Sequence, residues 1–382
     1  MGGSDDPADP PAAGDLAPTF DVYEVRSDSQ RVLYVGQPRA DRETIERELR
    51  PLFRERGYEV SLDRGYDAAE NVPLTAGEHV LVARPRTSGN GGFPWRNAVL
   101  FVLTALSTLF AGSVYWYQIP ITDQPLRALE AWPFVVAIMG VLGIHELGHY
   151  AMSRYHGVDA SLPYFIPLPT YIGSMGAVIR MRGRIPDRQA LFDIGVAGPL
   201  AGLVATVVVT VIGLQLDPLP AQEAAAAASD AARVEFNDPP LLVLLAELTG
   251  TAEKLERGLV HPVVFGGWVG MLVTLLNLLP VGQLDGGHIL RAIVGERQET
   301  LAAAVPGVLF ALAGYLFFIR GSVNSVGIWA MWGLFAVGLA YAGPASPVHD
   351  NPLDRKRVVV GALTFVLGAL CFTPVPVEVI TP

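Results

Sequence analysis

Seven long apolar stretches constrain the fold of this 382-residue chain more than any other feature. A helix needs about 20 apolar residues to cross the hydrocarbon core of a membrane, and its backbone polar groups must be paired within the core. Each stretch is close to that length, which predicts a mostly α-helical, polytopic membrane bundle of about seven spans. The stretches are Asn97–Tyr117, Trp132–Met152, Ile194–Leu216, Pro262–Val281, Leu301–Ile319, Val323–Gly343 and Val358–Phe372.

The composition agrees with a membrane protein that carries a soluble appendage. Hydrophobic residues make up 51% of the chain and charged residues 17%, below the roughly one quarter usual in soluble domains. The single cysteine, Cys371, excludes an intrachain disulfide and a zinc site built from cysteines. The net charge of −10 and the scarcity of lysine suit either a high-salt cytoplasm or a GC-rich genome. The first twenty residues lack the basic and then apolar pattern of a cleavable signal peptide.

The chain before the first apolar stretch predicts a separate soluble domain. Residues 1–18 are rich in Asp, Pro and Gly, and we expect a disordered tail. Residues 19–87 predict a small α+β domain of order ββαββ, with a helix that begins after the N-cap Asp41 and ends at Gly57. Without a phosphate-binding loop or a Cys/His cluster, this domain is expected to be a regulatory or interaction module. Residues 88–96 form the expected linker to a membrane-embedded domain over 97–376.

The Lys and Arg residues of the connections predict the orientation of the spans. Basic residues cluster before the first stretch and after the second, fourth and sixth, whereas the other connections are poorer in them. Cytoplasmic connections carry the excess of basic residues. We therefore expect a multi-pass protein of the cell membrane with a cytoplasmic N-terminal domain and an external C-terminus. This orientation places His149 near the cytoplasmic end of the second stretch.

Five residues of the second stretch, His145-Glu146-Leu147-Gly148-His149, carry the strongest chemical signal. The interiors of the other six stretches contain no His, Asp, Glu, Lys or Arg, and ionisable groups at membrane depth are costly unless they have a function. Histidines at i and i+4 lie on one face of a helix, where both can bind one zinc ion. The adjacent glutamate can serve as the general base toward a water that the metal activates. The pattern predicts a zinc hydrolase whose site lies within the bilayer.

Asp285 is the candidate third ligand, because a catalytic zinc site commonly has three protein ligands. Pro280 breaks the fourth stretch near its cytoplasmic end, and the glycines between Pro280 and His288 allow the backbone to fold back. The expected orientation then places Asp285 at about the depth of His149. Irregular backbone at that depth is tolerated where it lines a polar cavity.

Two motifs together resemble the site-2 protease family of intramembrane zinc metalloproteases. The first is His145–His149, and the second is Asn277-Leu-Leu-Pro-Val-Gly-Gln-Leu-Asp285-Gly. The resemblance implies that His145, His149 and Asp285 bind one zinc ion, that Glu146 is the catalytic base and that Asn277 lies near the scissile carbonyl. Residues 30–62 and the segment around Asp285 are also similar to the chloroplast and cyanobacterial branch whose plant members are named for ethylene-dependent gravitropism deficiency.

The family resemblance also implies a single-span membrane protein as substrate and no nucleic-acid partner. The family's Gly-rich segment corresponds to residues 173–177, and we expect substrate contacts from Gly173, Ser174, Met175 and Gly176. This segment is either an edge strand that pairs with extended substrate or a short hairpin that closes the cavity. Asn277 either donates to the developing oxyanion or makes an interhelical hydrogen bond.

Three other functions are compatible with parts of the sequence. A metalloprotease with a glutamate as third ligand would use Glu247, Glu253 or Glu256, which lie in a connection expected outside the cell. A metal-binding scaffold or an inactive homologue would have no need of Glu146. A transporter would usually show polar groups spread over several helices or internal repeats. We expect His288 at the cytoplasmic surface rather than beside the metal ligands.

Overall fold

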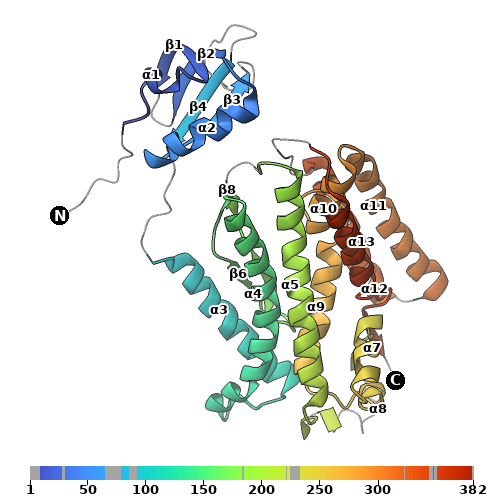
Figure 1. Ribbon diagram of the computed structural model, residues 1–382. Helices are drawn as coiled ribbons and strands as arrows, with labels where there is room; N and C mark the ends of the chain where they lie inside the picture. Colours follow the sequence, from blue (N-terminus) through green and yellow to red (C-terminus); the bar gives the residue numbers. More distant parts are fainter. Residues whose placement is uncertain are drawn as a thin grey trace. The chain divides into compact units, whose positions relative to one another are not determined.

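The computed structural model describes residues 9–27, 31–64, 79–85, 93–182, 185–220, 222–223, 233–321, 323–343, 347 and 351–380. The chain divides into two compact units, Met1–Phe93 and Pro94–Pro382. Each unit has buried apolar clusters of its own, and the elements of both are labelled in Figure 1.

The N-terminal unit is a four-stranded antiparallel sheet with a helix against it. The strands lie in the order β1-β2-β4-β3 in the sheet, and α2 (Arg42–Glu55) connects β2 to β3 in the sequence. Asp41 caps this helix, since its Oδ1 accepts a hydrogen bond of 2.9 Å from the backbone amide of Thr44. Ile45, Leu49 and Phe53 recur at helical spacing and are buried against the sheet. The strands are β1 (Phe20–Ser27), β2 (Val32–Pro38), β3 (Tyr58–Arg64) and β4 (His79–Pro85).

Part of the expected disordered tail folds onto this unit. The short helix α1 (Ala13–Leu16) places Leu16 in the core, where it is fully buried. The Tyr34 hydroxyl donates a hydrogen bond of 2.6 Å to the Pro11 carbonyl. Residues 9–18 thus differ from the expectation, because one apolar side chain and one buried hydrogen bond hold them to the sheet. Residues 1–8, and residues 88–92 of the expected linker, lie outside the described residues.

The second unit is a bundle of apolar helices. Within the described residues, five helical segments are long and apolar enough to cross a membrane: Trp95–Trp116, Pro125–Tyr155, Arg188–Gln215, Arg297–Arg320 and Ser325–Ala342. Their main helices are α3 (Trp95–Ala111), α4 (Trp132–Tyr155), α5 (Arg188–Gln215), α11 (Arg297–Tyr315) and α12 (Val323–Ala342). The predicted class, a mostly helical membrane protein with a small N-terminal sheet, agrees with this architecture.

The expectation of about seven spans is not confirmed. The fourth stretch forms α9 (Val263–Asn277), which stops after 15 residues because the chain turns at 278–284 around Pro280 and continues as α10 (Asp285–Val294). The seventh forms α13 (Arg355–Ala369), also of 15 residues. A helix of that length rises about 22 Å, short of the roughly 30 Å of a hydrocarbon core.

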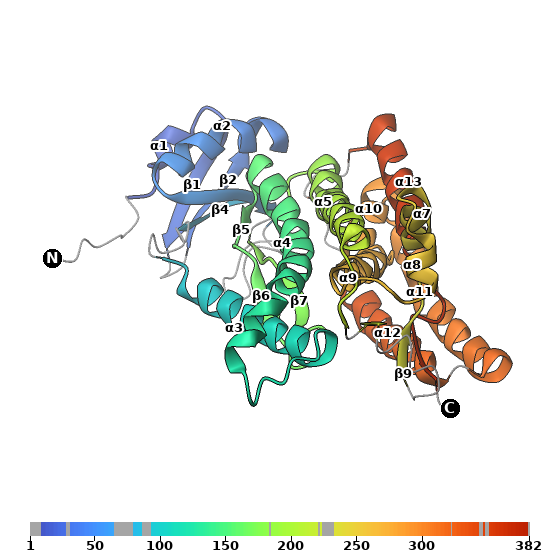
Figure 2. The same ribbon diagram turned by 90° about the horizontal axis from the view of Figure 1, so that it is seen from below.

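The helices α4, α5, α9 and α10 make the part of the bundle that matters for function. Helix α5 packs against α4, α9 and α10, so segments distant in sequence lie side by side in both views (Figures 1 and 2). Between α4 and α5 the chain forms an antiparallel pair, β6 (Tyr164–Pro167) and β7 (Ser174–Val178), that packs against α3 and α4. The remaining short elements are β5 (Asp159–Ala160), β8 (Met181–Arg182), β9 (Arg233–Phe236), α7 (Pro240–Leu248), α8 (Ala252–Glu256) and β10 (Val377–Ile380).

Candidate metal centre

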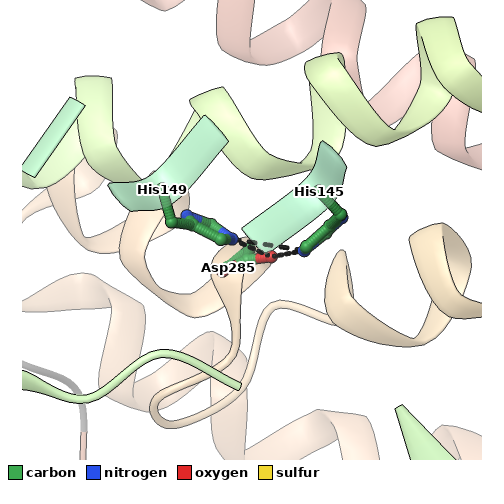
Figure 3. A group of neighbouring side chains, drawn as sticks. All are labelled: His145, His149 and Asp285. Atoms are coloured by element: carbon green, nitrogen blue, oxygen red, sulfur yellow. Dashed lines mark hydrogen bonds and ion pairs between the residues drawn. The ribbon is translucent and has the colours of Figure 1, made fainter. Parts of the chain in front are cut away.

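Two histidines of one helix and an aspartate from a distant part of the chain meet inside the helical unit (Figure 3). The Nε2 atoms of His145 and His149 are 3.2 Å apart, and each is 3.2 Å from Oδ2 of Asp285. Both histidines project from one face of α4, and Asp285 is the first residue of α10. The two imidazoles are buried, and the carboxylate is 14% exposed. The structure therefore brings the three predicted ligands together.

The spacing and chemistry of these atoms fit a zinc ion. Ligands at tetrahedral positions with bonds of about 2.0 Å lie about 3.3 Å from one another, close to the observed triangle, and leave a fourth position free. His149 Nδ1 lies 2.8 Å from the Ile194 carbonyl, which can only accept, so Nδ1 carries the proton. Nε2 of His149 then has its lone pair free for a metal, the arrangement typical of zinc-bound histidine.

The broken helix explains how Asp285 reaches this point. Gly282 has a φ of +53° and lies directly against the Leu339 backbone, a combination that only glycine tolerates well. A Cβ on Gly286 would overlap the Leu278 carbonyl, so this glycine lets α10 start tightly against the turn. As the first residue of α10, Asp285 also places its negative charge at the positive end of the helix dipole.

Two glycines of α5 supply a feature that the sequence analysis missed. A Cβ on Gly198 would overlap the His149 ring, and one on Gly202 would lie 2.8 Å from His145 Nδ1. Helix α5 thus forms the wall behind both imidazoles, and the Ile194 carbonyl on the same helix orients one of them. The Gly-x-x-x-Gly spacing in an apolar helix, a signal for close helix packing, was available in the sequence.

Glu146 and Asn277 flank the three ligands. Glu146 follows His145 on α4, is 8% exposed, and lies close to the backbone of Ile179, just beyond β7. Asn277 ends α9, and its side-chain Nδ2 lies 3.2 Å from His145 Nε2. Both side chains are therefore positioned beside the point that the ligands share.

The Gly-rich segment forms a hairpin with β6. Gly173 precedes β7 with a φ of +79° and lies so close to the α3 backbone at Thr108 that a Cβ would overlap it. Ser174 Oγ is 3.3 Å from the Ile166 carbonyl and 3.1 Å from the Gly176 amide. Met175 is 63% exposed. Residues 174–178 thus pair with β6 on one side, and both cavity closure by this hairpin and pairing of substrate with the other edge of β7 stay predictions.

His288 is not at the surface, so that expectation is wrong. It lies one turn after Asp285 on α10, is 5% exposed, and its Nε2 has no hydrogen-bond partner among the described residues. The reason is tertiary: α10 packs this face against α5, where a Cβ on Gly195 would be 3.0 Å from His288 Cβ. The alternative third ligands also fail, since Glu247, Glu253 and Glu256 are exposed on α7 and α8 and do not join the His–His–Asp group.

The fold and the site together define a membrane protein with a His–Glu-x-x–His helix and a buried metal site completed by a distant aspartate. Residues 133–319 match the family model of peptidase family M50, which confirms the predicted site-2 protease resemblance. The matched segment includes His145, His149 and Asp285.

Proteins from plants show where the similarity lies. The chain is 37% identical over 250 residues to the "probable zinc metalloprotease EGY1, chloroplastic" of Arabidopsis thaliana, which covers 63% of this chain and 42% of that protein. It is 29% identical to the Arabidopsis EGY2 protein, over 74% of this chain and 49% of the relative. It is 31% identical to EGY1 of Oryza sativa subsp. japonica, over 69% and 50%. The chain spans about half the length of these relatives, and no solved structure matches it significantly.

Proposed function

We propose that the chain is a zinc metalloendopeptidase that hydrolyses peptide bonds within or next to the transmembrane segments of other membrane proteins. The observation that carries this proposal is the triangle of His145 Nε2, His149 Nε2 and Asp285 Oδ2, with 3.2 Å sides, inside a bundle of membrane-length helices. The M50 match and the names of the plant relatives support the same chemistry.

His145, His149 and Asp285 would hold the zinc ion, which when bound acts as a Lewis acid and lowers the pKa of a coordinated water. Glu146 is the proposed general base: it accepts a proton from the attacking water and passes it to the leaving amine. Its position next to His145 and its low exposure suit this role, because few water molecules compete for the carboxylate.

Asn277 is the proposed donor to the oxyanion. Its Nδ2 points to the same place as His145 Nε2, and an amide donor can stabilise the charge that develops on the scissile carbonyl. A donor of this kind contributes about 3 kcal/mol to transition-state stabilisation.

The β6–β7 hairpin is the proposed substrate platform. A helical substrate has its carbonyls paired, so it must unwind before cleavage, and an extended segment can then add to the free edge of β7 over Gly173–Gly176. The proximity of Glu146 to the Ile179 backbone supports this assignment, because Ile179 directly follows β7 and the proposed base thus lies beside the end of that strand.

We further propose a single-span membrane protein as substrate and a multi-pass enzyme in the cell membrane. The excess of Arg and Lys in alternate connections supports a cytoplasmic N-terminus and an active site toward the cytoplasmic side. In this arrangement the N-terminal unit shares the compartment of the active site and acts as a regulatory or interaction module.

The test is comparative membrane proteomics of cells that express the wild type, Glu146→Gln or the control Glu247→Gln. Glu247 is an exposed glutamate on α7, so its replacement should leave cleavage unchanged. In Glu146→Gln, uncut single-span proteins should accumulate while the purified protein keeps its zinc. Full cleavage by Glu146→Gln would refute the base assignment, and wild-type protein without bound zinc would refute the proposed function.

A further inference from the structure

A groove of about 760 Å³ lies between α5 and the beginning of α13 and is separate from the metal centre. Its α5 side includes Asp193 and Val196, and its α13 side includes Arg355, Lys356 and Val360. Nothing in the proposed catalytic chemistry uses these residues.

The groove lies at one end of the helices, at the boundary of the membrane-spanning segments. Asp193 is in the second turn of α5 and is 3.0 Å from His156, the residue directly after α4. The candidate spans end at Tyr155 and begin at Arg188. A molecule in this groove would therefore sit at the depth of lipid headgroups.

The charges around the groove favour an anion. Arg357 is already neutralised, since its guanidinium is 2.7 Å from Asp193 and 2.5 Å from Asp354. Arg355 and Lys356 are exposed, and neither has a carboxylate partner among the described residues. Three cations against two carboxylates leave a net positive charge on the lining, presented by two free side chains.

An apolar surface continues from the groove along α13. Val360, Leu363 and Leu367 lie at spacings of three and four residues, on one face of the helix, and are 38%, 56% and 36% exposed. On α5, Val196 in the groove is followed four residues apart by Leu200 and by Val204, which is 65% exposed. An acyl chain that extends from the groove toward the bilayer centre would contact both stripes.

We propose that this groove binds an anionic phospholipid, with the phosphate between Arg355 and Lys356 and the acyl chains along α13 and α5. Basic pockets at the ends of membrane helices recognise anionic headgroups in this manner. The proposal is independent of the proteolytic function, because binding needs neither zinc nor Glu146. Asp193 immediately precedes Ile194, whose carbonyl orients His149, so a lipid in the groove would lie one residue from the wall of the metal centre.

Native mass spectrometry of the full-length protein in neutral detergent tests the proposal with dioleoyl phosphatidylglycerol and dioleoyl phosphatidylcholine as probes. The double variant R355A/K356A should bind phosphatidylglycerol about 25-fold more weakly than the wild type, since each basic side chain near an anionic headgroup contributes roughly fivefold. The control R154A/R297A removes two exposed arginines, one in the last turn of α4 and one at the start of α11, and should bind like the wild type. Unchanged thermal unfolding of the exposed-site variants verifies that both are folded.

Three outcomes would overturn the proposal. The first is equal binding of phosphatidylglycerol by R355A/K356A and the wild type. The second is equal affinity of the wild type for phosphatidylcholine. The third is displacement of phosphatidylglycerol by excess inorganic phosphate, which would make the groove a site for free phosphate. Loss of proteolysis in any variant would not bear on this result, because only binding is measured.

Discussion

Replacement of Gly198 by alanine should disable the metal centre although none of its ligands is replaced. The new Cβ would overlap Nε2 and the adjacent carbons of the His149 ring, well inside van der Waals contact. The ring must retreat by about 1.5 Å to restore a normal contact. A retreat of that size would break the hydrogen bond from His149 Nδ1 to the Ile194 carbonyl, which sets the tautomer of the ring.

The size of the effect follows from the tolerance of zinc coordination. Metal–ligand distances in functional sites vary by only about 0.2 Å. The retreat of the His149 ring is several times larger, so His149 would no longer coordinate the metal. Loss of an orienting contact alone costs 10- to 100-fold in metal affinity, and we expect about 100-fold here, equivalent to about 2.7 kcal/mol. Gly202→Ala should cost less, because its Cβ would stand 2.8 Å from His145 Nδ1 and needs a smaller adjustment.

The assay is zinc affinity by chelator competition, with metal content measured by mass spectrometry of the purified protein. Gly140→Ala is the matched control, since Gly140 is also helical, precedes His145 on α4, and has nothing within 4 Å of its Cβ position. We expect the zinc affinity to be highest in Gly140→Ala, lower in Gly202→Ala and lowest in Gly198→Ala. A folded Gly198→Ala protein with zinc affinity within threefold of the wild type would refute the reasoning.

Three further predictions concern the third ligand and the N-terminal unit. Asp285→Asn should lower zinc affinity at least about tenfold while the exposed control Asp217→Asn keeps it, and equal metal content would remove Asp285 from the ligand set. Leu16→Ala should destabilise the N-terminal unit by about 3 kcal/mol in denaturant unfolding, whereas a change under 0.5 kcal/mol would show that α1 is not part of its core. Burial raises the pKa of Tyr34 from 10.0 to about 12, so the folded state disfavours the phenolate. The associated stability is fully present below pH 10 and is lost between pH 10 and 12, and circular dichroism should show a weaker loss for Tyr34→Phe.

Local sequence patterns were sufficient wherever the relevant interactions are short in range. The i, i+4 spacing alone places His145 and His149 on one helix face, and the N-cap Asp41 marks the start of α2. Apolar length alone identifies most of the membrane helices. Pro280 and the glycines after it predict the helix break between α9 and α10.

Contacts between distant segments were decided by the tertiary structure. Asp285 is 136 residues from His149, and only the packing of α10 against α5 brings its carboxylate to 3.2 Å from both imidazoles. The same packing buries His288, which its position after a turn had suggested to be exposed. The sequence around Leu16 predicts a polar tail, and only the folded sheet provides the apolar core in which Leu16 is buried.

The sequence by itself determined the class of protein, the chemistry of the ligands and the helix that carries two of them, because helix periodicity and hydrophobic length are properties of neighbouring residues. The lengths of α9 and α13, the glycine wall of α5 and the closure of the metal triangle depend on how helices cross. The crossing of two helices depends on the side-chain volumes of both partners. Gly198 by itself only lowers the local helix propensity, but in the folded protein its missing side chain leaves the space that the His149 imidazole occupies.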